Sequence, residues 1–234
     1  MRALLLTAVA ALTFGWSASE AATFNIDDFA TAQGPLNATS GTPVTNEVNG
    51  GGILGGYRGM LVDSDGANTT TGLIGSGALR YSNETNTIGS VSLSYDRNGT
   101  PGPGLGGVDV TDGGANDSFF VSILSLVGVV DISITVSDTS GNSATVSEIV
   151  SGVINTPGDT TTLAFSNLTG DPVNLTMVDT ILLVFDTDRQ ATDATFQSFG
   201  TDESLQPIPL PASFPMLLAG LGALVAGARR RKQA

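Results

Sequence analysis

The feature that most limits the fold of this chain is a two-residue alternation of apolar and polar side chains. Between residues 130 and 137, every second residue is Val or Ile, and the residues between them are Asp, Ser or Thr. Such alternation predicts a β-strand at 130–138 with its apolar side chains on one face. The Asp, Ser, Gly and Asn residues of 138–142 predict a hairpin turn into a second strand at 143–150.

Similar runs recur along the body of the chain, and no segment keeps a helical period. The other strands are predicted at 23–29, 57–62, 79–82, 89–96, 118–127, 160–168, 178–185 and 194–199. The runs at 118–127 and 178–185 are more continuously apolar, which predicts central strands. The glycine-dense stretch 50–59 predicts a bulged edge or a loop. Together these runs predict an all-β fold, a two-sheet antiparallel β-sandwich.

Both ends of the chain differ from this body. Residues 1–21 have the pattern of a secretory signal peptide, with Arg2, an apolar stretch at 3–14 and small residues before a cleavage site between Ala21 and Ala22. We expect a β-sandwich domain at 22–200, a linker at 201–206 and a separate C-terminal segment at 207–232.

The C-terminal segment combines a proline-rich motif, an apolar stretch and a basic cluster. No ionisable residue occurs between Leu210 and Ala228. A helix over 214–228 would be about 22 Å long, which spans a bilayer core if the arginines that follow snorkel to the interface. The basic cluster is Arg229, Arg230, Arg231 and Lys232. Clustered positive charge stays cytoplasmic, so the body is expected on the far side of the membrane.

A plain membrane anchor and three kinds of sorting signal compete for this segment. A GPI signal is disfavoured because the segment has four cationic residues behind its apolar stretch. A sortase signal is matched only in its Leu-Pro part. The residues Ile208, Pro209, Leu210, Pro211 and Ala212, with the apolar stretch and the basic cluster, resemble the PEP-CTERM group of bacterial sorting signals in its Val-Pro-Leu-Pro-Ala variant. Ile208 replaces the Val of that variant.

This resemblance implies a partner and a destination. The partner is an exosortase, a membrane-embedded protease that would cleave near the proline motif. The protein would pass through an inner-membrane intermediate with a cytoplasmic C-terminus and end at the cell surface or in the extracellular matrix, in association with exopolysaccharide. The body is weakly similar to jelly-roll sandwiches of the galactose-binding type, through the opening Ile26-Asp27-Asp28-Phe29 and a late Asp-rich return.

The charge of the body excludes several classes of function. Residues 22–206 contain 21 of the 22 acidic residues but only four arginines, a net charge of −17. Nucleic-acid binding needs a basic footprint, which is missing here. The chain contains no Cys and no His, which excludes disulfides, thiol chemistry, His-assisted catalysis and the usual zinc sites.

The acidic residues suggest a cation site but not an active site. Asp109, Asp112 and Asp117 crowd one Gly-rich loop, and oxygen-rich turns suit Ca²⁺. Solvated turns in which the Asp side chains bond the local backbone are the alternative. A glycosidase needs two carboxylates about 5–10 Å apart, but with 21 acids such a pair arises by chance.

The sequence therefore predicts an exported, non-catalytic surface or matrix protein. The alternative is a secreted carbohydrate-binding module with the same sorting segment. Its weakness is the shortage of aromatic platforms: Trp16, the only Trp, lies in the predicted signal peptide, and the only tyrosines are Tyr57, Tyr81 and Tyr95. Tyr95 alternates with core residues, and we expect it to be half-buried.

Overall fold

A computed structural model describes residues 23–96, 104–187 and 191–203, and nearly all of them belong to antiparallel strands or the turns between them. The strands are β1 (Phe24–Asp27), β2 (Gln33–Ala38), β3 (Val44–Asn49), β4 (Tyr57–Gly66), β5 (Thr70–Gly75), β6 (Ala78–Asn83), β7 (Thr87–Tyr95), β8 (Ser118–Asp138), β9 (Ser143–Ile154), β10 (Asp159–Ala164), β11 (Thr169–Gly170), β12 (Val178–Thr187) and β13 (Thr192–Asp202). Two short 3₁₀ turns are η1 (Leu54–Gly56) and η2 (Phe165–Asn167).

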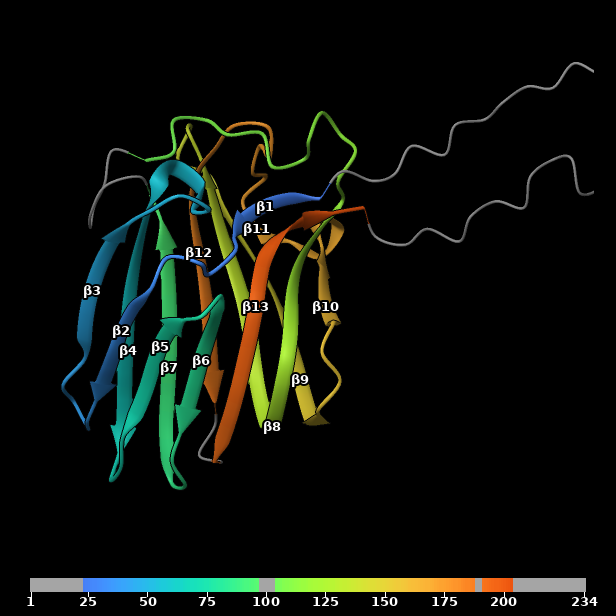
Figure 1. Cartoon of the computed structure of the whole chain (residues 1–234). Coiled ribbons are helices and arrows are strands. Elements are labelled where there is room, and N and C mark those ends of the chain that lie inside the picture. Colours follow the sequence, from blue (N-terminus) through green and yellow to red (C-terminus); the bar gives the residue numbers. More distant parts are fainter. Residues whose placement is uncertain (1–22, 97–103, 188–190, 204–234) are drawn as a thin grey trace, which may run out of the picture.

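The strands form two facing layers, as the sequence predicted (Figure 1). The first layer has the order β2-β5-β6-β13 and continues into the first half of β8, with β1 on β13 and β10 on β8. The second layer has the order β3-β4-β7-β12 and continues into the second half of β8, with β9 beyond it. The layers enclose one core of Val, Ile, Leu, Phe and Tyr side chains.

Strand β8 joins the two layers because it is long enough to take part in both. Its residues 118–127 pair with β13, and its residues 131–138 pair with β12. The sequence predicted two strands here, 118–127 and 130–138, and this division is wrong. Gly128, with φ of 114°, lies at the junction and pairs with Gly152 of β9, so the ladder continues through the bend.

Other differences from the predicted strands have local causes. The strand predicted at 160–168 ends at Ala164, because residues 165–167 turn into η2. Strands β2, β3, β5 and the two-residue β11 lie in regions where no strand was predicted. Tyr95 is fully buried rather than half-buried, because its ring stands over Phe199 and its hydroxyl donates to Asp27 Oδ2 at 2.9 Å.

A buried ion pair lies within the core. Arg58 Nη1 is 2.6 Å from Asp27 Oδ2, and both side chains are fully buried. Arg58 also donates through Nε to Gln33 Oε1 at 2.7 Å and through Nη2 to the carbonyl of Thr31 at 2.6 Å. Since both ions have left water, their hydrogen bonds must replace the lost hydration.

We expect the Arg58→Met variant to lose about 3–5 kcal/mol of unfolding free energy, because the Asp27 carboxylate would be buried without its counter-ion. Arg80 is exposed on β6, so Arg80→Met is a matched control that should change stability by less than about 0.5 kcal/mol. Urea unfolding measures both. Equal, small losses in the two variants would contradict this role of the ion pair.

The hairpin between β8 and β9 is closed by one carboxylate, at the turn that the sequence predicted. Asp138 Oδ1 accepts from the backbone N–H groups of Ser140 and Asn142, at 2.8 and 3.0 Å. Its Oδ2 accepts from Asn142 Nδ2 at 2.9 Å and from the N–H of Asn174 at 3.0 Å. These donors, first the Asn142 amide and then the Asn174 N–H, lower the pKa of Asp138 from 3.8 to about 2.

Because the folded-state pKa is the lower one, Asp138 stabilises the fold fully above pH 3.8, and this contribution is lost as the pH falls through about 2. We expect Asp138→Asn to flatten the decline of stability between these pH values. Asn142→Ala, which removes one donor, should flatten it in part. Chemical denaturation across this pH range measures the effect, and parallel curves for wild type and Asp138→Asn would contradict it.

Candidate functional site

The residues of the predicted sorting segment and of the signal cleavage site lie outside the described residues. These are Ile208, Pro209, Leu210, Pro211, Ala212, Arg229, Arg230, Arg231, Lys232, Ala21 and Ala22. The predicted membrane helix at 214–228 also lies outside them. Within residues 23–96, 104–187 and 191–203, no helix is long and apolar enough to cross a membrane.

The loop of the predicted cation site is held by local hydrogen bonds. Asp109 Oδ1 accepts from the N–H and the hydroxyl of Thr111, at 2.9 and 2.6 Å, and Oδ2 accepts from the N–H of Gly113 at 3.1 Å. The Thr111 hydroxyl, with these backbone donors, holds the pKa of Asp109 below its usual value. This is the geometry of an Asp side chain that bonds its own turn, the alternative that the sequence left open.

The other two acidic residues of that loop, Asp112 and Asp117, lie in its turn and at its junction with the sheet. Asp112 has a positive φ of 48° within the turn. Asp117 joins the loop to the sheet: its N–H donates to the Asp202 carbonyl at 3.2 Å, and its carbonyl accepts from Phe165 at 2.8 Å. Across the described part of the chain, no three acidic side chains come together as a group that could hold a metal ion. Calcium binding by Asp109, Asp112 and Asp117 stays a prediction.

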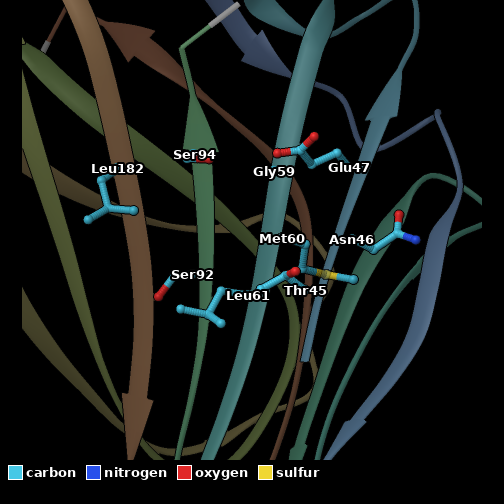
Figure 2. Close-up of a pocket in the computed structure, with 9 residues that line it drawn as sticks. All are labelled: Thr45, Asn46, Glu47, Gly59, Met60, Leu61, Ser92, Ser94 and Leu182. Carbon is cyan, nitrogen blue, oxygen red and sulfur yellow. The ribbon is translucent and has the colours of Figure 1, made fainter. Parts of the chain in front are cut away.

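A hollow lies on the outer face of the second layer, over strands β3, β4, β7 and β12 (Figure 2). Its volume is about 450 Å³, and its lining residues are Thr45, Asn46, Glu47, Gly59, Met60, Leu61, Ser92, Ser94 and Leu182. The strand register explains which side chains face it. Glu47, Gly59, Ser94 and Leu182 are consecutive cross-strand partners, and Thr45, Leu61 and Ser92 form the next row.

The hollow has open space over β4 because one of its lining residues, Gly59, has no side chain. A Cβ on Gly59 would collide with the Ser94 hydroxyl, so glycine leaves room for that hydroxyl to lie over the sheet. Leu61 and Leu182 keep 37% and 38% of their surface exposed, so they offer apolar contact beside the hydroxyls of Ser92 and Ser94. Mixed apolar and hydroxyl surfaces of this kind suit ligands that carry both CH and OH groups.

An aromatic side chain stands beside the carboxylate of the hollow. The Tyr57 hydroxyl donates to Glu47 Oε2 at 2.6 Å, and this hydrogen bond raises the pKa of Tyr57. Tyr57 is half-buried, whereas Tyr81 and Tyr95 are fully buried in the core. Of the three tyrosines that the sequence left as aromatic platforms, Tyr57 alone is therefore placed near a surface hollow.

Sequence reasoning did not identify this hollow. The alternating Ser90, Ser92 and Ser94 predicted the solvent face of a strand, but that pattern does not show which strands lie beside it. Strand β3, which supplies Thr45 and Glu47, has polar residues on both faces, and no strand was predicted there. The exposed Leu61 would have been a signal, since it lies between Gly59 and Asp63 on the outer face of its strand.

Comparison with solved structures finds likeness at low identity. A family 11 carbohydrate-binding module of the cellulosomal cellulase Lic26A-Cel5E of Clostridium thermocellum has a TM-score of 0.40 and 12% identity, over 82% of this chain and 100% of that chain. The agarase AgWH50C has a TM-score of 0.41 and 10% identity, over 78% of this chain and 24% of that chain. PfGH50B has a TM-score of 0.39 and 14% identity, over 62% of this chain and 22% of that chain.

At these values the likeness says nothing about what this chain binds. Among curated proteins, none matches the chain. The family model of the PEP-CTERM protein-sorting motif matches residues 207–232, the range that the sequence predicted for the sorting segment. The chain thus carries a PEP-CTERM sorting motif, the kind of signal that marks an exported protein for an exosortase.

Proposed function

We propose that this chain is an exported, non-catalytic surface or matrix protein, sorted and cleaved by an exosortase and associated with exopolysaccharide. The observation that carries the proposal is the match of residues 207–232 to the PEP-CTERM motif. The acidic body supports it, because a net charge of −17 keeps an extracellular domain soluble. In this view the C-terminal segment directs sorting and is then removed, while the β-sandwich persists as the mature protein.

We expect the protein from its native host to begin near Ala22 and to lack the cluster Arg229, Arg230, Arg231 and Lys232, because one cut follows Ala21 and another falls near the Ile208–Ala212 motif. Intact-mass analysis of the released protein measures both ends. The control is a strain without its exosortase, in which the C-terminal cluster should remain. A mature form that keeps the cluster in the unaltered host would contradict exosortase processing and indicate a plain anchor.

A second candidate function is carbohydrate binding, and the hollow over β3, β4, β7 and β12 favours it. The hollow presents the hydroxyls of Ser92 and Ser94 and the carboxylate of Glu47, which pair with sugar hydroxyls. Leu61 and Leu182 supply apolar contact for the CH groups of a sugar ring. The partner of this hollow would be a neutral polysaccharide, since the body already carries a large negative charge.

We expect glycan-array binding of the mature protein to fall at least about tenfold in Ser94→Arg, because a long side chain would fill the hollow at its centre. Ser133→Arg is the matched control. Ser133 lies on the same outer face, on β8, but does not line the hollow, so this variant should bind as wild type does. Equal binding by all three proteins, or binding by none, would leave carbohydrate recognition at the hollow without support.

A further inference from the structure

Strand β9 forms an edge of the second layer (Figure 1). Along one side, residues 143–154 pair continuously with β8. Along the other side, the pairing recorded for the described residues is with β11, at Ala144 and Thr145. From Val146 to Ile154 the outward side of β9 therefore has no strand beside it within the described part of the chain.

The hydrogen bonds beside β11 show which backbone groups of β9 point outward. The carbonyl of Ser143 accepts from the N–H of Asp171 at 2.9 Å, so Ser143 directs its backbone groups away from β8. In an antiparallel ladder the residues of a strand alternate between its two neighbours. The odd-numbered residues Ser147, Ile149, Ser151 and Val153 therefore present their N–H and C=O groups at the outer edge.

This edge has few of the features that keep edge strands apart. Ile149 and Val153 are 65% and 67% exposed, and Val127 of β8, the cross-strand partner of Val153, is 50% exposed. Glu148 is the single ionisable residue in 143–158, although the body as a whole is strongly acidic. Edge strands that remain unpaired usually carry Lys, Pro or inward charges, and a long β-branched run of low charge favours pairing.

We propose that β9 is a homotypic docking edge, at which two copies of this chain pair antiparallel about a two-fold axis through Ser151. In this register Ile149 of each copy lies opposite Val153 of the other, so the four exposed apolar side chains meet on one face. Ser151 lies opposite its counterpart. All three pairs join residues whose backbone groups point outward, as the hydrogen-bonded positions of an antiparallel ladder require.

A second copy fits this edge better than an unrelated acidic strand would. The pairing is self-complementary, because in one register Ile149 of each copy contacts Val153 of the other. It also keeps the two Glu148 carboxylates apart, since each lies opposite Ile154. The ladder ends before Thr145, where β11 occupies the edge, so it spans roughly residues 147–155 and remains a closed pair rather than a growing fibre.

Disulfide trapping tests the register, because the chain contains no Cys of its own. In a Ser151→Cys variant the two introduced thiols would lie opposite each other, with Cα atoms about 5.5 Å apart, within the range of about 4.4–6.8 Å that a disulfide bridges. Ser147→Cys is the matched control on the same edge. Its two copies would be offset by eight residues, roughly 26 Å apart, and should not cross-link.

The experiment uses the full chain in mild detergent, oxidised gently and separated on non-reducing gels, with sedimentation velocity on the unmodified protein. We expect a covalent dimer from Ser151→Cys and monomer from Ser147→Cys. Adding Ile149→Lys to Ser151→Cys should lower the yield of dimer about tenfold, because an apolar contact is lost. The new Lys would face Asp131 in its own sheet, so the fold should keep its melting temperature.

Two results would overturn the proposal. One is equal cross-linking of the two Cys variants, which would indicate random collision. The other is a monomer from Ser151→Cys at every concentration tested. This second result is also the one expected if the edge of β9 pairs with a strand of a different protein.

Discussion

The buried pair between Asp27 and Arg58 is the constraint on which the closing of the sandwich depends. Asp27 ends β1, which pairs with β13 in the first layer, whereas Arg58 lies on β4 in the second. Gln33 of β2 extends the pair, since it accepts from Arg58 and donates to the Asn46 carbonyl of β3 at 2.8 Å. Tyr95 adds β7. Such a network contributes less to net stability than apolar packing of equal volume would, but it is costly to break. It therefore penalises any arrangement in which these strands do not meet.

A second cluster of buried polar side chains also joins strands of the two layers, at another point in the core. Asn83 of β6 donates to the Thr87 carbonyl at 2.7 Å and to the Thr187 hydroxyl at 2.8 Å, and it accepts from Thr70 at 2.9 Å. Tyr81 shares the Thr187 hydroxyl at 2.8 Å. These residues come from β5, β6, β7 and β12, so the cluster again joins both layers. Between the two clusters the apolar core is continuous. Polar contacts thus fix which strands face each other, and burial of apolar surface supplies the driving force.

The sequence predicted the fold class and most strands because the alternation of residues is a local property. Strand β7, the β8–β9 hairpin and its Asp138 turn were all visible in that way. Four strands, β2, β3, β5 and β11, were missed for physical reasons. Strand β2 contains Gly34 and Pro35, β3 has Asn46 between the two valines of its inner face, β5 has Gly72 on its buried face, and β11 is only two residues long. The burial of Arg58 was hidden too, because Arg58 lies within the glycine-dense stretch 50–59, which predicted a bulged edge or a loop. The hollow could not be predicted, since Glu47, Ser94 and Leu182 meet only through the order of strands in the sheet.

The arrangement of the second layer relates the two proposals to each other. The hollow lies over β3, β4, β7 and β12, whereas the edge strand β9 lies beyond β8, at the opposite end of the same layer. A two-fold axis that pairs two β9 edges runs perpendicular to the joined sheet, so the outer faces of both copies point the same way. Docking through β9 would therefore leave both hollows open and on one surface. Two weak sites held in this way bind a repeating polymer far more tightly than one, because the second contact becomes intramolecular. A hollow lined by serine hydroxyls and two leucines, in a body whose single tryptophan, Trp16, lies in the predicted signal peptide, would need that gain to hold a polysaccharide.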